Sequence, residues 1–160
     1  MKSSRYIQLA LLAAAFLLIL GLALAPRIPS DKRIIADASP LDLKLMQAVS
    51  HVQSGDNPME GIQMLRSILE EDSTQVDAHW HLGQFSITSR QIEKAHYRFQ
   101  KVLDYDSEAK YPEAYFWLAQ TNVALGNEDE AVKLLQKYLT LETDTIVLTG
   151  VKRMIDQLQN

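Results

Sequence analysis

The sequence predicts an all-α chain: one transmembrane helix, then a right-handed helical solenoid of about three helix pairs and a C-terminal capping helix. Three observations predict it. An uninterrupted apolar run stands near the N-terminus. Helix-starting signals then recur about every 34 residues, and the apolar residues between them recur with the 3.6-residue period of an α-helix. The sequence has no alternating strand pattern of useful length.

The first two segments predict a membrane anchor. Residues 1–5 are a basic tail, and residues 6–25 are almost wholly apolar. A helix of that length rises roughly 30 Å, about the thickness of a bilayer's hydrocarbon core. We therefore expect residues 6–25 to be a single-pass signal anchor in contact with the lipid bilayer. A removed signal peptide is the alternative, which Pro26 disfavours because it would directly follow the candidate cleavage site at Ala25.

The orientation of this anchor depends on the charges that flank it. Two basic residues precede the apolar run and three follow it closely, so the counts nearly balance. The short tail with two cations and a free amine is typical of a bacterial signal anchor. We expect an inner (cytoplasmic) membrane protein with its folded domain in the periplasm, and the reverse orientation stays open.

A folded domain is expected over residues 40–160, after a linker over 26–39. The linker contains two prolines and mixed charge without a helical period. At its end Ser39 can cap a helix, Pro40 suits the first helical position, and Asp42 completes a capping box.

Similar signals recur along this domain. Asn57, Thr74 and Asn127 are each followed three residues later by an acid, as at a helix start. Gly55 and Gly126 stand where a preceding helix must end. These marks divide the domain into units near residues 42–75, 76–111 and 112–143, and a capping helix over 144–158.

The units share a pattern of small and large residues in register. A pair in the first helix precedes a small residue by twelve positions and a large one by sixteen: Leu82-Gly83, Ala95, Phe99; Leu118-Ala119, Ala131, Leu135; and, in degenerate form, Ala48-Val49, Gly61, Leu65. This pattern resembles the tetratricopeptide repeat (TPR) family. Small residues let the two helices of a pair approach closely, and large ones fill the space between pairs. The sequence departs from the family at Arg90, where a turn glycine is usual.

The resemblance implies a partner-binding groove lined by the first helix of each pair. The register assigns to it an apolar row, an amide row and two acids at the edge: Met46, Trp80, Phe116; Ser50, Gln84, Gln120; Asp77, Glu113. Amides can bond a peptide backbone, and aromatic rings supply contact area. The sequence does not decide whether Trp80 and Phe116 line the groove or the core. Each has an adjacent aromatic residue, and a small shift of the register would exchange the roles of the two neighbours.

The sequence offers no arrangement for chemistry. His79 and His81 are two residues apart, so on a helix they point in different directions and cannot share a metal. There is no cysteine, which excludes thiolate ligands and a cysteine nucleophile. We expect no catalytic residue, cofactor, metal or small-molecule substrate, and no enzyme activity.

The charge balance bears on the partner. All 20 acidic residues lie at or beyond Asp31 together with 13 basic ones, which gives this part a net charge of −7. Since acidic domains repel phosphate backbones, we expect no nucleic-acid partner. The sequence predicts a membrane-tethered scaffold that binds a protein or peptide, in assembly or biogenesis of a membrane or periplasmic complex. The alternative is a structural accessory subunit of a larger membrane complex that uses no groove.

Overall fold

The computed structural model describes residues 38–159, and these contain seven α-helices and no strand. The helices are α3 (Pro40–Ser54), α4 (Pro58–Glu71), α5 (Val76–Thr88), α6 (Ile92–Tyr105), α7 (Glu113–Ala124), α8 (Glu128–Leu139) and α9 (Thr145–Leu158). The all-α prediction is therefore confirmed for this part of the chain.

The predicted basic tail (1–5), the predicted anchor (6–25) and nearly all of the predicted linker lie outside the described residues. From Ala38 to Gln159, none of the helices combines the length and hydropathy needed to cross a bilayer.

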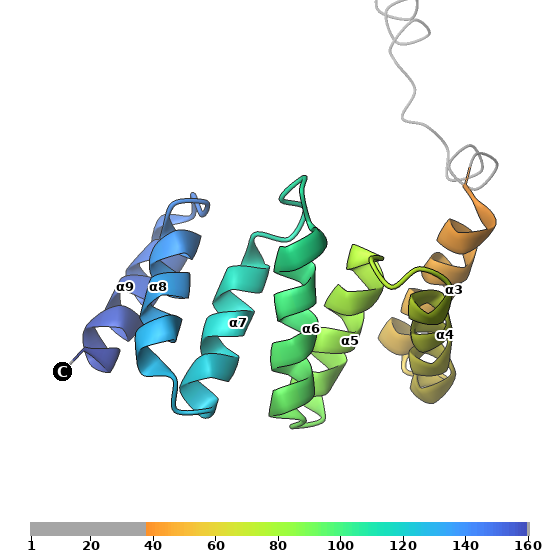
Figure 1. Cartoon of the computed structure of the whole chain (residues 1–160), viewed down its shortest axis with the longest axis horizontal. Coiled ribbons are helices and arrows are strands. Elements are labelled where there is room, and N and C mark those ends of the chain that lie inside the picture. Colours follow the sequence, from red (N-terminus) through yellow and green to blue (C-terminus); the bar gives the residue numbers. More distant parts are fainter. Residues whose placement is uncertain (1–37, 160) are drawn as a thin grey trace, which may run out of the picture. The chain divides into compact units, whose positions relative to one another are not determined.

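The helices pack in consecutive pairs that stand side by side (Figure 1). Helix α3 packs on α4, α5 on α6, and α7 on α8, while each second helix also contacts the first helix of the next pair. The last pair continues in α9, which packs on α8. Each pair therefore depends on its neighbours to bury its apolar surface, as in a helical solenoid.

The start of α3 follows the sequence prediction. Ser39 Oγ accepts a hydrogen bond from the Asp42 amide at 3.1 Å, and the Ser39 amide donates to Asp42 Oδ2 at 3.0 Å. These reciprocal bonds are the predicted capping box. At the other end Gly55 has φ +74, a left-handed conformation that costs glycine little and ends the helix.

Other helix starts differ from the prediction. Thr74 does not cap a helix: α5 begins at Val76, and the Thr74 hydroxyl donates to Asp72 Oδ1 at 2.7 Å. Asn57 and Asn127 do precede α4 and α8, but neither side chain bonds the helix backbone. A polar residue with an acid three positions later indicates that a helix begins nearby. It does not determine the hydrogen-bond partner of the polar side chain, because local turns compete with the helix N-terminus for that side chain.

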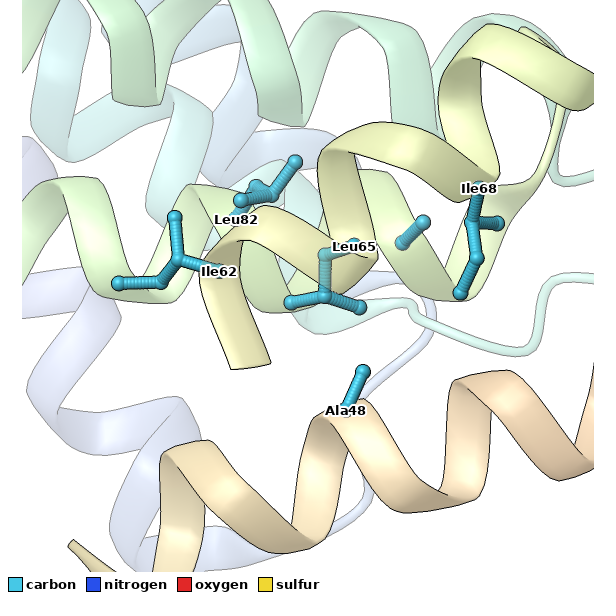
Figure 2. Close-up of a cluster of buried hydrophobic side chains, with 6 residues drawn as sticks. Ala48, Ile62, Leu65, Ile68 and Leu82 are labelled. Atoms are coloured by element: carbon cyan, nitrogen blue, oxygen red, sulfur yellow. The ribbon is translucent and has the colours of Figure 1, made fainter. Parts of the chain in front are cut away.

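The core is divided along the stack into clusters that join neighbouring pairs. In the first cluster Ala48 of α3 and Leu65 of α4 are fully buried and point into the same space, and Leu82 of α5 packs against them (Figure 2). A Cβ atom on Gly61 would lie 2.5 Å from the carbonyl oxygen of Ala48. Only glycine therefore permits this approach of α3 and α4.

The turn between α5 and α6 carries the predicted departure from the family pattern. Arg90 has φ +58, in the left-handed region that glycine adopts at least cost. The turn keeps its geometry without glycine: the amide of Arg90 donates to the carbonyl of Ile87 at 3.0 Å, and that of Gln91 donates to the carbonyl of Ser86 at 2.8 Å.

Candidate functional site

The eight predicted groove residues all lie on the first helices of the pairs or at their immediate start. We call this set the first-helix surface. Its members differ widely in exposure: Met46, Ser50 and Glu113 are exposed, Asp77, Gln84, Phe116 and Gln120 are half-buried, and Trp80 is buried.

Trp80 belongs to the core. Its side chain is 8% exposed and lies in the cluster that joins the second and third pairs. The indole stacks on the ring of Tyr111, with centroids 4.5 Å apart, and meets Phe99 edge-on at 5.6 Å. Of the two roles left open by the sequence, the structure places Trp80 in the packing role, so it offers a partner little area.

Asp77 is engaged with the next unit. Its Oδ1 accepts a hydrogen bond from the Tyr111 hydroxyl and forms a 2.5 Å ion pair with Lys110 Nζ. Burial raises the pKa of the Tyr111 phenol, and the hydrogen bond to Asp77 is the second largest cause of this increase. Because Lys110 and Tyr111 lie just before α7, these contacts tie the start of α5 to the loop of the third pair.

Phe116 and Gln120 are partly covered by later helices. The Phe116 ring lies 5.6 Å from that of Trp117 and 5.7 Å from that of Tyr138 in α8. The Gln120 amide nitrogen is 3.8 Å from the sulfur of Met154 in α9. The accessible residues of the first-helix surface are therefore Met46, which is 47% exposed, and Ser50 on α3, together with Glu113 at the start of α7.

Two hollows lie along the second helices α4 and α6, and α5 contributes residues to the lining of both. One has a volume of about 350 Å³ and the other about 570 Å³. Both are lined by Arg66, Tyr97 and Arg98, so they adjoin one another. We call the two together the α4/α6 groove.

This groove was not predicted from the sequence, although α6 carries a signal for it. Lys94, Tyr97, Arg98 and Lys101 occupy positions i, i+3, i+4 and i+7, which is one face of a helix. The basic-aromatic stripe stands out in a domain that is acidic overall. The facing Arg66 of α4 is far away in the sequence, and only the fold brings it there.

The floor of the groove contains a buried histidine. His79 Nε2 lies 3.0 Å from the carbonyl of Ser73, and Nδ1 lies 3.2 Å from Arg98 Nη1. Both contacts are hydrogen bonds when Nε2 carries the proton, since Arg98 can only donate. Burial lowers the pKa of His79, the hydrogen bond to Ser73 partly opposes this, and the charge of Arg98 acts in the same direction as burial. The imidazole thus serves as a neutral bridge between α5 and α6.

Within residues 38–159 no group of three or more histidine or acidic side chains is placed to hold a metal ion. The accessible features are thus the exposed residues of the first-helix surface and the basic α4/α6 groove.

Comparison with known families bears on this arrangement. Residues 87–149 match the family model described as tetratricopeptide repeat. This part of the chain is a tetratricopeptide-repeat region. The sequence search of curated proteins finds no significant match.

Solved structures with the same fold include three named proteins. The type III secretion translocator chaperone SycD of Yersinia enterocolitica has a TM-score of 0.63 and 18% identity, covering 86% of this chain and 90% of SycD. MamA has a TM-score of 0.59 and 17% identity, and the likeness covers 80% of this chain and 79% of MamA. YrrB, described as a TPR protein with an unusual peptide-binding site, has a TM-score of 0.57 and 19% identity. The likeness covers 77% of this chain and 62% of YrrB. At these identities the likeness establishes the fold.

Proposed function

We propose that this protein is a membrane-tethered scaffold that binds a protein or peptide partner through the accessible part of its first-helix surface. The observation that carries the proposal is a stack of TPR-like helix pairs in which the predicted groove residues differ in how far they are buried. Met46 and Ser50 remain exposed on α3, while the corresponding aromatic positions are packed. An exposed methionine beside polar side chains suits an adaptable contact with a partner.

The solved relatives support a protein or peptide as the partner class. SycD is described as a chaperone of translocators and YrrB as having a peptide-binding site. Half-buried Gln84 lies one helical turn beyond Trp80 and can offer its amide to the backbone of a bound segment.

The tether rests on the sequence alone. Residues 6–25 have the length and apolarity of a membrane span, and the basic tail before them favours an inner-membrane anchor with a periplasmic repeat domain. Such a layout would hold the partner close to the bilayer, which suits assembly or biogenesis of a membrane or periplasmic complex.

Site-specific photo-crosslinking tests the binding surface. A photoreactive residue replaces Met46 in the full chain, and the matched control replaces Gln136, an exposed residue of α8. We expect a discrete protein adduct from position 46 and none from position 136. Adducts from position 136 alone would instead favour the accessory-subunit role, in which the repeats brace neighbouring subunits.

Protease access tests the tether separately. Intact spheroplasts expose periplasmic domains to added protease, and lysis exposes cytoplasmic ones. We expect the chain to fractionate with membranes and its repeat domain to be cut before lysis. Protection until lysis would reverse the orientation, and release from membranes in high salt and carbonate would exclude the anchor.

A further inference from the structure

The α4/α6 groove concentrates positive charge in an acidic domain. Its lining contains four cationic side chains against two carboxylates: Arg66, Lys94, Arg98 and Lys101 against Glu70 and Glu93. The groove therefore has an excess of two positive charges, whereas the chain from residue 31 onward has a net charge of −7. This local reversal of sign favours an anionic occupant.

Three of these cations lack a carboxylate partner. Within residues 38–159 Arg66, Lys94 and Arg98 form no ion pair, whereas Lys101 pairs with Asp104 at 3.0 Å. Arg98 is half-buried and donates to neutral His79. A guanidinium removed from water without a counter-ion is costly, and an incoming carboxylate would relieve that cost.

Aromatic and apolar side chains stand among the cations. Tyr97 is 53% exposed, with Arg98 Cζ lying 5.3 Å and Lys101 Nζ 5.9 Å from its ring centroid. Leu82 and Phe85 line the smaller hollow. Such a lining suits a chain segment that alternates acidic with apolar or aromatic side chains, because apolar walls add contact area that a bare anion does not use.

The dimensions of the groove fit an extended segment. The smaller hollow includes Gln91 and Lys94 at the start of α6, and the larger includes Lys101 and Tyr105 at its end. The groove thus runs the length of this helix, which has 14 residues and is about 21 Å long. An extended peptide would need roughly six residues to span it.

We propose that the α4/α6 groove is a second docking site, which binds an acidic extended segment of a protein partner. Its cations come from the second helices α4 and α6, and it shares no lining residue with the first-helix surface. Arg66 and Arg98 hold carboxylates of the segment, and Tyr97 contacts its apolar side chains.

The chain's own linker does not complement this groove. Residues 26–37 contain three basic and two acidic residues, a net charge of +1. A phosphate group or an anionic lipid headgroup would satisfy one or two cations without using the length of the groove or its apolar wall. An acidic extended segment with apolar side chains would use both the length of the groove and its apolar wall.

Selection from a display library of random eight-residue peptides tests the assignment. The baits are the full chain in mild detergent, an Arg66→Gln/Lys94→Gln variant, and a Lys133→Gln/Lys152→Gln control that removes two cations from α8 and α9. All four positions are exposed, so circular dichroism should show the same helix content and melting temperature in each bait. We expect the unmodified and control baits to enrich peptides rich in Asp and Glu, and the groove variant to lose that enrichment.

Fluorescence anisotropy with one selected peptide then gives the affinity. We expect binding to weaken about tenfold in the groove variant, as for loss of hydrogen bonds to a charged group. It should be unchanged in the control and in Gln84→Ala, which alters the first-helix surface. Equal acid enrichment by all three baits, or none by the unmodified chain, would overturn the assignment. So would displacement of the peptide by millimolar inorganic phosphate or by short-chain phosphatidylglycerol, which would identify a phosphate or lipid site.

Discussion

Gly83 of α5 lies directly against the ring of Phe99 in α6, so that a Cβ atom at position 83 would be 2.8 Å from Phe99 Cε1. Phe99 is fully buried and cannot swing aside without disturbing its neighbours. The contact fixes how closely the two helices of the second pair approach. It also explains why a small residue is needed here.

We predict that Gly83→Ala destabilises the fold by about 1–2 kcal/mol, because overpacking outweighs the better helix propensity of alanine. Gly150 of α9 is the matched control, since a Cβ there would meet nothing within 4 Å. Gly150→Ala should stabilise by up to about 1 kcal/mol. Urea unfolding followed by circular dichroism measures both. Equal effects of the two substitutions would contradict the packing argument.

We predict a second contrast between two residues that the sequence assigns to the same row. Trp80→Ala should cost about 3–5 kcal/mol, because it empties a packed core position. Met46→Ala should change stability by less than about 0.5 kcal/mol, because Met46 is exposed. Thermal and urea unfolding of both variants test this. Similar small losses for both would place Trp80 at the surface.

This contrast shows what a repeat pattern can predict. The spacing of Gly83, Ala95 and Phe99 locates the close approach of two helices, because that geometry is local to one pair. Burial of Trp80 depends on Tyr111, which the chain supplies from the loop before the next pair. Register alone therefore identifies the helix face of a residue but not what covers it.

The α4/α6 groove illustrates the same limit. The stripe on α6 is visible in the sequence as Lys94, Arg98 and Lys101 at helical spacing. Arg66 comes from another unit, 32 positions before Arg98, and only stacking of the pairs brings it into the same lining. Helix starts were predictable where the side chain bonds the backbone, as at Ser39, and less so where a local turn competes, as at Thr74.

We predict that the cap of α9 contributes measurably to closing the stack. Asp144 Oδ1 accepts hydrogen bonds from the amides of Ile146 at 2.7 Å and Val147 at 3.3 Å. Asp144→Ala should therefore cost about 1 kcal/mol and speed amide hydrogen exchange in α9. Asn57→Ala is the comparison, because Asn57 is the N-cap of α4 but its side chain forms no hydrogen bond to the helix backbone. This substitution should therefore cost less. A larger loss at Asn57 would argue against the cap.

The last prediction concerns pH. His79 is buried, and its pKa lies below the value of 6.5 that the unfolded chain would have. Between these two values the unfolded state binds more protons, so the free energy of unfolding decreases as pH falls. The contribution of neutral His79 is complete above pH 6.5 and is lost as pH falls through 6.5 toward the folded-state pKa. His81 acts in the same direction, because burial lowers its pKa too.

The charged groups around His79 do not reverse the direction of this pH dependence. Arg98 and Lys101 lower its pKa together with burial, whereas the hydrogen bond to Ser73 and, more weakly, the charge of Asp104 raise it; the net direction is downward. In His79→Gln the amide nitrogen can donate to Ser73 and the amide oxygen can accept from Arg98, but the side chain cannot titrate. Urea unfolding at pH 7.5 and pH 5.0 should show a smaller loss of stability for this variant than for the unmodified chain. An identical loss would mean that protonation of His79 is not coupled to folding, because only the variant lacks that titration.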